Sequence, residues 1–319
     1  MRRAFYDILI AGIIICTASS FAFSADAPDP SKAQGVVSGN NKDAEFSLGS
    51  GYRNDELNWN IAGNTDGSNP NILSELKWTG LEIFQVEARA RKDFGDTYLT
   101  GYFDWGWIND GKNQDSDYNG DDRTQEYSRS TNSGDDGTVW DISTGVGFNI
   151  TAYKYTPFKF SPVFGYSYHR QNLTITNGYQ TIPHTGPFSG LDSTYNARWY
   201  GPWAGADLSY KTGRLTLGGL FEYHLVEYYA TANWNLRSDF AHPKSFEHTA
   251  NGMGVVAELE ADISVSESWA FVFSVNARRF KTGEGRDRTY FSDGSRSDTK
   301  LNEVNWNSYS AMLDLKYIF

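Results

Sequence analysis

The stretch AMLDLKYIF (residues 311–319) decides the fold, because its side chains change character at every position. The odd positions carry apolar or aromatic groups: Ala311, Leu313, Leu315, Tyr317 and Phe319. The even positions are mixed: Met312, Asp314, Lys316 and Ile318. Successive side chains of a strand point to opposite faces. One face therefore suits lipid and the other suits a polar interior, which is the two-residue period of a transmembrane β-barrel.

The same alternation recurs along the chain and predicts ten strands, near 44–62, 70–93, 97–109, 137–153, 155–172, 197–211, 214–234, 252–265, 268–282 and 302–319. Four links are short: DFGD (93–96), AYKYT (152–156), YKTGR (210–214) and SVSES (264–268). Five are long and polar: AGNTDGSNP (62–70), 110–136, 173–196, 235–251 and 283–301. The pattern predicts an all-β fold, a ten-stranded antiparallel transmembrane β-barrel over residues 44–319, with long extracellular loops and short periplasmic turns.

Composition supports a barrel in a membrane. The chain contains 20 Tyr, 20 Phe and 10 Trp, and membrane barrels carry aromatic girdles at both interfaces. After the N-terminal segment, no run approaches the roughly 20 apolar residues of a spanning helix. The last strand, which ends in Phe319 with Tyr317 two residues earlier, resembles the assembly signal of bacterial outer-membrane barrels. That resemblance implies the barrel assembly machinery as a partner.

The N-terminus predicts export. Residues 1–24 place Arg2 and Arg3 before an apolar run from Ile8 to Cys16, followed by small residues, which is typical of a secretory signal peptide. Residues 25–43 have no apolar period, and we expect a flexible periplasmic leader there. We therefore expect the protein in the bacterial outer membrane, its loops facing the cell exterior, with outer-membrane lipid or lipopolysaccharide as a partner.

Charge and cysteine content narrow the function. The formal net charge is −11, and the single Cys, Cys16, lies in the predicted signal peptide. Disulfide and thiol chemistry are therefore not expected in the exported chain, nor is nucleic-acid binding. Inward-facing charges mix both signs, as in Glu87, Arg89 and Arg278, and we expect them to pair across a narrow lumen. His224 is expected to face inward in a structural role.

The acidic stretch NQDSDYNGDD (113–122) is the first candidate site. Asp115, Asp117, Asn119, Gly120 and Glu126 fit a calcium-loop pattern, with oxygen ligands at alternate positions and a closing carboxylate. No helical period flanks the stretch, although an EF-hand requires one. The sequence leaves open a Ca²⁺ site, or no cofactor and a solvated acidic loop on the barrel rim.

The layout resembles the omptin family of outer-membrane proteases. The resemblance covers about residues 45–319 and rests on ten strands, five long outer loops, SELKW (74–78), and Asp115 and Asp117 in the second outer loop. It implies that these acids face an Asp–His pair across a groove at the barrel mouth. Asp239 and His242 stand in the corresponding fourth loop. In omptins that pair activates a water molecule.

The resemblance thus implies a surface endopeptidase for cationic peptides or proteins, with a dependence on lipopolysaccharide. However, two residues separate Asp239 from His242, where omptins have one. In an extended strand this spacing turns the two side chains to opposite faces. A turn or bulge near Pro243 would restore the pairing.

The aromatic strands and acidic loops also resemble the porin-like outer-membrane proteins first described from chlamydia-related bacteria. That resemblance implies a non-catalytic barrel, either a narrow porin or a surface-binding protein or adhesin. Both alternatives stay open on the sequence. A His nitrogen within hydrogen-bond reach of Asp239 would favour the endopeptidase, and separated side chains or an open lumen would favour the non-catalytic barrel.

Overall fold

A computed structural model describes residues 43–150 and 157–319. The predicted signal peptide, the predicted leader up to residue 42 and the whole link 152–156 lie outside the described residues. In the described part, no helix is long and apolar enough to cross a membrane. The elements are β1 (Ala44–Ile61), β2 (Ser74–Phe94), β3 (Thr97–Gly120), the 3₁₀ turn η2 (Asp121–Arg123), β4 (Thr124–Phe148), β5 (Phe158–Ile182), β6 (Gly186–Pro187), β7 (Ser193–Thr212), β8 (Leu215–Asn233), β9 (Phe246–Ser264), β10 (Trp269–Tyr290) and β11 (Arg296–Ile318).

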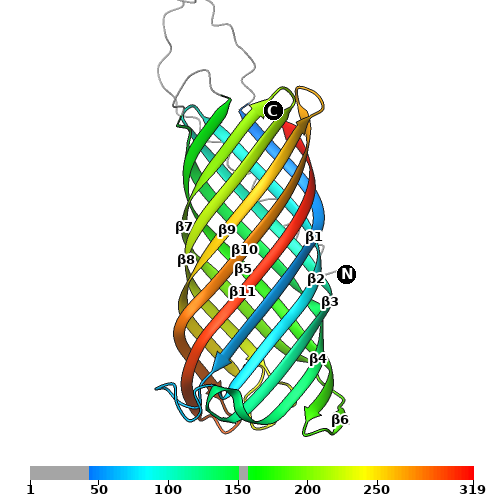
Figure 1. The fold of residues 1–319 in the computed structure, drawn as a ribbon, viewed down its shortest axis with the longest axis vertical. Coiled ribbons are helices and arrows are strands. Elements are labelled where there is room, and N and C mark those ends of the chain that lie inside the picture. The colour runs from blue at the N-terminus through cyan, green and yellow to red at the C-terminus, as the bar shows by residue number, and fades with distance from the viewer. Residues whose placement is uncertain (1–42, 151–156) are drawn as a thin grey trace, which may run out of the picture. The chain divides into compact units, whose positions relative to one another are not determined.

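The strands form one closed antiparallel ring, whose strongly tilted strands are seen in Figure 1. β1 pairs with β11, and β4 pairs with β5, so that the ring has no open edge. Ten long strands make up this ring, and the two-residue β6 adds to the side of β5 at Tyr179 and Gln180. The predicted ten-stranded antiparallel barrel is therefore confirmed, with β6 as an eleventh, very short strand in the sheet.

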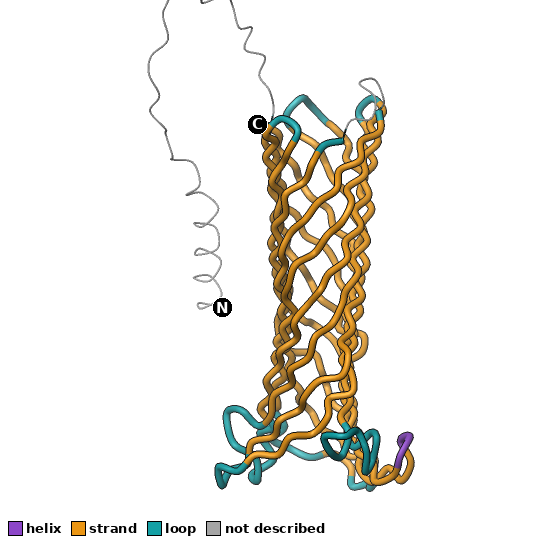
Figure 2. The backbone as a smooth tube through the Cα atoms, turned by 90° about the vertical axis from the view of Figure 1, so that its left-hand side faces the viewer, coloured by secondary structure: helices purple, strands orange, loops and turns teal. Residues whose placement is uncertain are grey.

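The two ends of the barrel differ in their connections. Short turns join β2 to β3, β7 to β8 and β9 to β10 at one end. Gly95 and Gly213 occupy two of these turns with φ of +71° and +59°, a backbone region that glycine adopts without strain. We call this the short-turn end. The β4–β5 connection also lies at this end, and the opposite, long-connection end carries the links β1–β2, β3–β4, β5–β7, β8–β9 and β10–β11 (Figure 2).

The strands reach much further toward the long-connection end than the sequence predicts. β3 and β4 have 24 and 25 residues, and only η2 separates them. Most of the predicted loop 110–136 is therefore strand, and parts of the predicted loops 173–196, 235–251 and 283–301 are too. Segments such as YSRSTNSGDDGT (127–138) are polar on both faces, so they lack the alternation that identifies a strand. Backbone pairing with neighbouring strands holds them extended.

The outer face carries an apolar belt next to the short-turn end. Its exposed side chains include Leu48, Phe84, Phe164, Phe221, Leu259, Phe273 and Leu313. Beyond the belt, outward positions of β3 and β4 become polar, as at Lys112, Thr131 and Asp135. This division matches a barrel that spans lipid with part of its height only.

The inner face is arranged in layers that follow β1 from the short-turn end. Ser47 and Gly49 line the first part of the lumen, Arg53 and Asp55 an ionic layer, and Leu57 and Trp59 an aromatic layer. The alternation predicted for residues 311–319 is confirmed, since Met312 and Asp314 are buried whereas Leu313 and Leu315 are exposed.

Candidate functional site

The acid pair at the barrel mouth lies on a strand and not in a loop, which corrects the prediction. Asp115 stands opposite Leu76 and Ser130, and Asp117 opposite Ser74 and Ser128. Leu76 is fully buried in the interior core. Because directly paired residues of neighbouring strands share a face, both carboxylates point to the inner side of the mouth.

A local irregularity of β2 and β3 gives the acids this orientation. The register shifts between Thr79 and Ile83, where Gly80 has a φ of +60°. Inner positions of β2 are odd-numbered at Ile83 but even-numbered at Trp78, and both side chains are buried. A bulge that inserts a residue exchanges the two faces of a strand. Without it, Asp115 and Asp117 would face outward.

The calcium-loop interpretation does not fit this geometry. Residues 115–120 are extended in β3, so they do not curl around a single point as a calcium loop does. Glu126, the expected closing ligand, binds Arg129 at 2.6 and 2.7 Å. In residues 43–150 and 157–319, no group of three or more His, Cys, Asp or Glu side chains is placed to hold a metal ion.

The connection between β8 and β9 meets the acid pair, as the predicted groove requires. The Trp234 side chain lies near Asp115, and the Arg237 guanidinium is close enough to attract both Asp115 and Asp117. Sequence reasoning missed Trp234 and Arg237. Their signal was the segment NWNLRSD (233–239), in which an aromatic residue and a cation precede Asp239.

The acid pair holds its protons more tightly than ordinary carboxyls. Burial raises the pKa of Asp115 to about 8, with a further contribution from the neighbouring charge of Asp117. Burial also raises the pKa of Asp117, although hydrogen bonds from Ser74 and Ser128 oppose the shift. Close carboxylates share protons in this way when too few cations balance them.

Asp239 and His242 do not form a pair with each other. Arg237 binds Asp239 through two bonds, from Nε at 2.9 Å and Nη2 at 2.8 Å, and this bond lowers the pKa of Asp239. The two ring nitrogens of His242 lie 2.7 Å from the Asn233 side-chain oxygen and 3.2 Å from the Arg237 carbonyl oxygen. The structure thus brings Asp115, Asp117 and Arg237 together but does not place His242 on Asp239.

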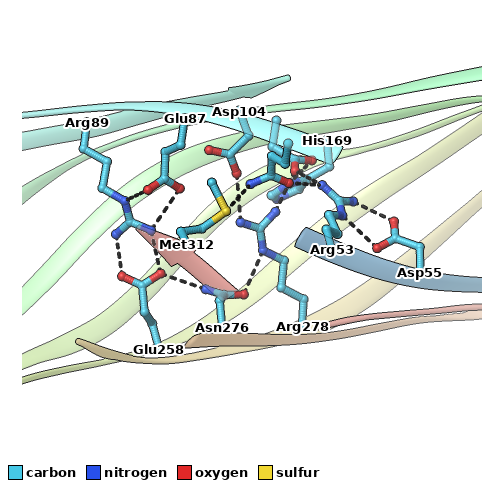
Figure 3. Close-up of polar contacts among 12 residues, drawn as sticks. Arg53, Asp55, Glu87, Arg89, Asp104, His169, Glu258, Asn276, Arg278 and Met312 are labelled. Atoms are coloured by element: carbon cyan, nitrogen blue, oxygen red, sulfur yellow. Dashed lines mark hydrogen bonds and ion pairs between the residues drawn. The ribbon is translucent and has the colours of Figure 1, made fainter. Parts of the chain in front are cut away.

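The ionic layer inside the barrel is the second concentration of charge, and Figure 3 shows most of it. Asp141 on β4 accepts bonds from Arg53 and Arg278 at 2.6 Å each and lies 3.0 Å from Nδ1 of His169. Arg53 also binds Asp55 at 2.7 Å. His169 lies inside β5, and its side chain is buried in the lumen. Contacts between β1, β4 and β10 cross the lumen here.

His224 is confirmed as an inward residue with satisfied ring nitrogens. Nδ1 lies 3.1 Å from the Ser167 hydroxyl and Nε2 lies 2.9 Å from Glu222. All three side chains are buried.

The aromatic layer fills the lumen between the ionic layer and the mouth. Trp199 on β7 contacts Trp306 on β11, their ring centroids 6.1 Å apart, and Phe280 stacks on Trp306 at 4.9 Å. None of these three side chains is exposed to solvent. The two layers occlude the lumen with side chains that meet from opposite walls.

A closed antiparallel ring with an outer apolar belt and a charged, occluded interior defines an outer-membrane β-barrel. The chain belongs to the family of Protochlamydia outer membrane proteins (Pom), whose model matches residues 47–319. The resemblance to proteins of chlamydia-related bacteria is thereby confirmed. No curated protein was found to match the sequence.

A solved structure confirms the omptin-like architecture. The outer-membrane protease OmpT from Escherichia coli superposes with a TM-score of 0.71 at 14% identity, covering 87% of this chain and 97% of that chain. The translocator domain of the autotransporter NalP from Neisseria meningitidis gives 0.35 at 11% identity, covering 86% and 88%. OprG from Pseudomonas aeruginosa gives 0.34 at 12% identity, covering 87% and 97%. At these identities the likeness concerns the fold alone.

Proposed function

We propose that this protein is a non-catalytic surface-binding barrel whose mouth receives a cationic group of a peptide or protein partner. One observation carries the proposal: the Arg237 guanidinium, which is ion-paired to Asp239, is near enough to attract the carboxylates of Asp115 and Asp117. Asp239 holds this guanidinium, and His242 contacts only the backbone carbonyl oxygen of Arg237. A partner's Arg or Lys side chain has the same chemistry and would take the same position.

The hydrogen bonds of the mouth argue against water activation. A general base must be within hydrogen-bond reach of the proton that it removes, and a carboxylate normally orients it. Both nitrogens of His242 already contact oxygens outside the acid pair. Asp239 is neutralised by Arg237. The endopeptidase implied by the omptin resemblance therefore has less support than the binding function.

The occluded lumen favours binding over conduction. Ion pairs and rings meet across the barrel in the ionic and aromatic layers. An ion would have to displace buried charge pairs, whose disruption costs several kcal/mol. A narrow porin is therefore the weaker form of the non-catalytic alternative.

The outer wall supports an orientation with the long-connection end facing the cell exterior. Beside the belt, Trp140, Tyr168 and Tyr200 stack with centroids 4.9 and 5.9 Å apart. One step further from the belt, Arg170 stands directly opposite Arg198. Aromatic rings and paired cations suit the headgroup region of an anionic leaflet. The lipid partner in this proposal is anionic outer-membrane lipid, including lipopolysaccharide.

The test uses the full chain refolded in detergent, with and without lipopolysaccharide. Fluorescence anisotropy would measure binding of a labelled arginine-rich peptide, and a dibasic fluorogenic peptide would report cleavage. We expect salt-sensitive binding without turnover. Replacing Asp115 and Asp117 together by Asn should weaken binding about tenfold or more, since each lost charge-assisted bond contributes roughly 1.5–3 kcal/mol.

The matched control is Asp135→Asn, which removes an exposed carboxylate from β4. Turnover that disappears in both Asp117→Ala and His242→Ala would establish the endopeptidase instead. Absence of peptide binding by the unaltered protein would refute the binding proposal. Conductance across a planar bilayer would show that the lumen is a pore.

A further inference from the structure

A cavity of about 180 Å³ lies inside the lumen, between the ionic layer and the short-turn end. We call it the chamber. A single water needs only roughly 10–15 Å³ of such space, so the chamber has room for a small organic molecule. It is far from Asp115 and Asp117, which face the mouth at the other end of the barrel.

The chamber is lined by more acids than bases. Six carboxylates contribute to its wall: Glu45, Asp207, Glu222, Glu258, Glu260 and Asp314. Its three basic residues are each held by two acids: Arg89 by Glu87 and Glu258, Arg91 by Asp93 and Asp207, and Lys316 by Glu45 and Asp262. The bases of the wall are therefore already committed to ion pairs.

Two of the carboxylates have no ion-pair partner in the described part of the chain, Asp314 and Glu260. Asp314 is only 2% exposed, and its Oδ1 has no hydrogen-bond partner among the described residues. A Cβ atom added to Gly49 would lie 1.5 Å from Oδ1 of Asp314, so this carboxylate occupies the space that a side chain would need. In the same way, a Cβ atom added to Gly218 would collide with the Glu260 side chain. Glycine at both positions leaves space for the carboxylates on the inner wall. A buried carboxylate without a partner is costly, so the wall lacks positive charge here.

Among the described residues, the charged side chains of the chamber are more exposed toward the short-turn end than toward the ionic layer. Exposure of the charged side chains is highest near that end, at 34% for Glu45 and 30% for Asp207. It falls to 2% for Glu87 and 5% for Glu258, where the ionic layer begins. The chamber is therefore a blind pocket, and a ligand can enter it from one side.

The wall also contains an apolar cluster, formed by Tyr98, Val163 and Trp203. Metal ions prefer several converging oxygen, nitrogen or sulfur ligands, and the residues in 43–150 and 157–319 offer no such group. We propose that the chamber binds a small organic cation, a linear alkyl diamine or polyamine. Its ammonium groups would bind Asp314 and Glu260, and its methylene chain would pack on the apolar cluster.

The test is isothermal titration calorimetry of the refolded full chain in detergent with putrescine and spermidine. We expect one binding site. Asp314→Asn and, separately, Glu260→Gln should each weaken binding about tenfold, which corresponds to loss of one charge-assisted bond. Glu56→Gln, which removes an exposed carboxylate on the outer face of β1, should leave the affinity unchanged.

The outcomes separate this site from the mouth. Retention of diamine binding in the doubly neutralised Asp115 and Asp117 variant supports the chamber, whereas its loss there assigns the binding to the mouth and overturns the proposal. Equal affinity of the unaltered protein and both chamber variants, or binding of Ca²⁺ in place of diamine, also overturns it. Resistance to unfolding in SDS without heating would verify that each variant is folded. If Asp314→Asn fails to fold, Glu260→Gln still tests the proposal, because Glu260 is only partly buried and its substitution should perturb the fold less.

Discussion

Asp141 in the ionic layer and Asp115 at the mouth are both inward-facing carboxylates, but their partners differ. Asp141 is surrounded by Arg53, Arg278 and His169, all within hydrogen-bond distance. Asp115 has a second carboxylate beside it, with the Trp234 side chain and the charge of Arg237 nearby. The negative charge of Asp141 is balanced by cations of its own chain. The charge of Asp115 and its neighbour Asp117 is balanced only in part.

This difference distinguishes charges that stabilise the barrel from charges that are available to bind a ligand. A matched set of charges stabilises one arrangement of the strands, and any ligand would have to compete with it. An unmatched pair of acids keeps capacity for a cation from outside the chain. Both regions are rich in charge, so charge alone does not mark a site. A binding site is indicated where the carboxylates outnumber the cations that balance them.

The largest expected effect is a loss of stability when the ionic layer is disrupted. Asp141→Ala leaves Arg53 and Arg278 buried without their shared acid, and we expect the free energy of unfolding to fall by about 3–5 kcal/mol. Urea unfolding in lipid vesicles, followed by Trp fluorescence, measures it. Asp135→Ala on the same strand is exposed and should change stability by about 0.5 kcal/mol or less. A loss below about 1 kcal/mol for Asp141→Ala would mean that water already screens the ionic layer.

A smaller effect, a gain in peptide affinity, is expected at the mouth. Arg237→Gln removes the internal cation that competes for the acid pair, so affinity for an arginine-rich peptide should rise about fivefold, or roughly 1 kcal/mol. The anisotropy assay measures it. Lys112→Gln removes a similar charge from the outer face of β3 and controls for net charge. Weaker peptide binding in Arg237→Gln would indicate that Arg237 contacts the peptide and does not compete with it.

The pH dependence of the mouth should be smaller still. Loss of the Asp115 proton, whose pKa is about 8, strengthens the attraction of the acid pair for a cation without being required for binding. Peptide affinity should therefore rise a few-fold from pH 6.5 to 9, while peptide arginines stay charged. Stability changes in the opposite direction. The raised pKa of Asp115 gives a contribution that is complete below its unfolded value, about 3.9, and is lost as pH rises through 8.

Titration of binding and of unfolding between pH 5 and 9.5 would measure both trends. Asp115→Asn should flatten both, because it removes the titrating carboxyl. An affinity that falls with rising pH would contradict the assignment of Asp115 as the titrating group.

The smallest expected effect is that of His242→Ala. The ring is exposed and bonds to Asn233 and the Arg237 carbonyl, so we expect peptide affinity to change less than about twofold, or 0.4 kcal/mol. Asp117→Ala in the same assay provides the contrast. A loss in His242→Ala as large as that in Asp117→Ala would place the imidazole in the site.

The barrel was predictable where a membrane imposes alternation. Leu313 and Leu315 face outward and Asp314 faces inward because lipid and lumen demand opposite chemistry at neighbouring positions. Beyond the apolar belt, toward the long-connection end, the outer face no longer contacts lipid, and alternation is no longer required. Thr131 and Asp135 face solvent beside other polar side chains, so the extension of β3 and β4 left no alternating pattern to detect.

The mouth was predictable only in part. Asp115 and Asp117 stood out by their spacing, and the structure places the β8–β9 connection against them as the resemblance implied. The bond between Arg237 and Asp239 is set by the fold of that connection. Loop geometry of this kind has no period in the sequence, so the spacing of Asp239 and His242 did not reveal it.

The length of β3 and β4 has a consequence for what the mouth can meet. A strand of 25 residues at about 3.3 Å per residue and a tilt of about 40° rises roughly 60 Å, against an apolar band of about 25 Å. In the proposed orientation, the acid pair stands well clear of the lipid surface, on the part of the barrel wall that extends beyond the membrane. A bulky macromolecule can dock there without touching the bilayer. The outer face of this part of the wall can also change sequence, because it does not contact lipid.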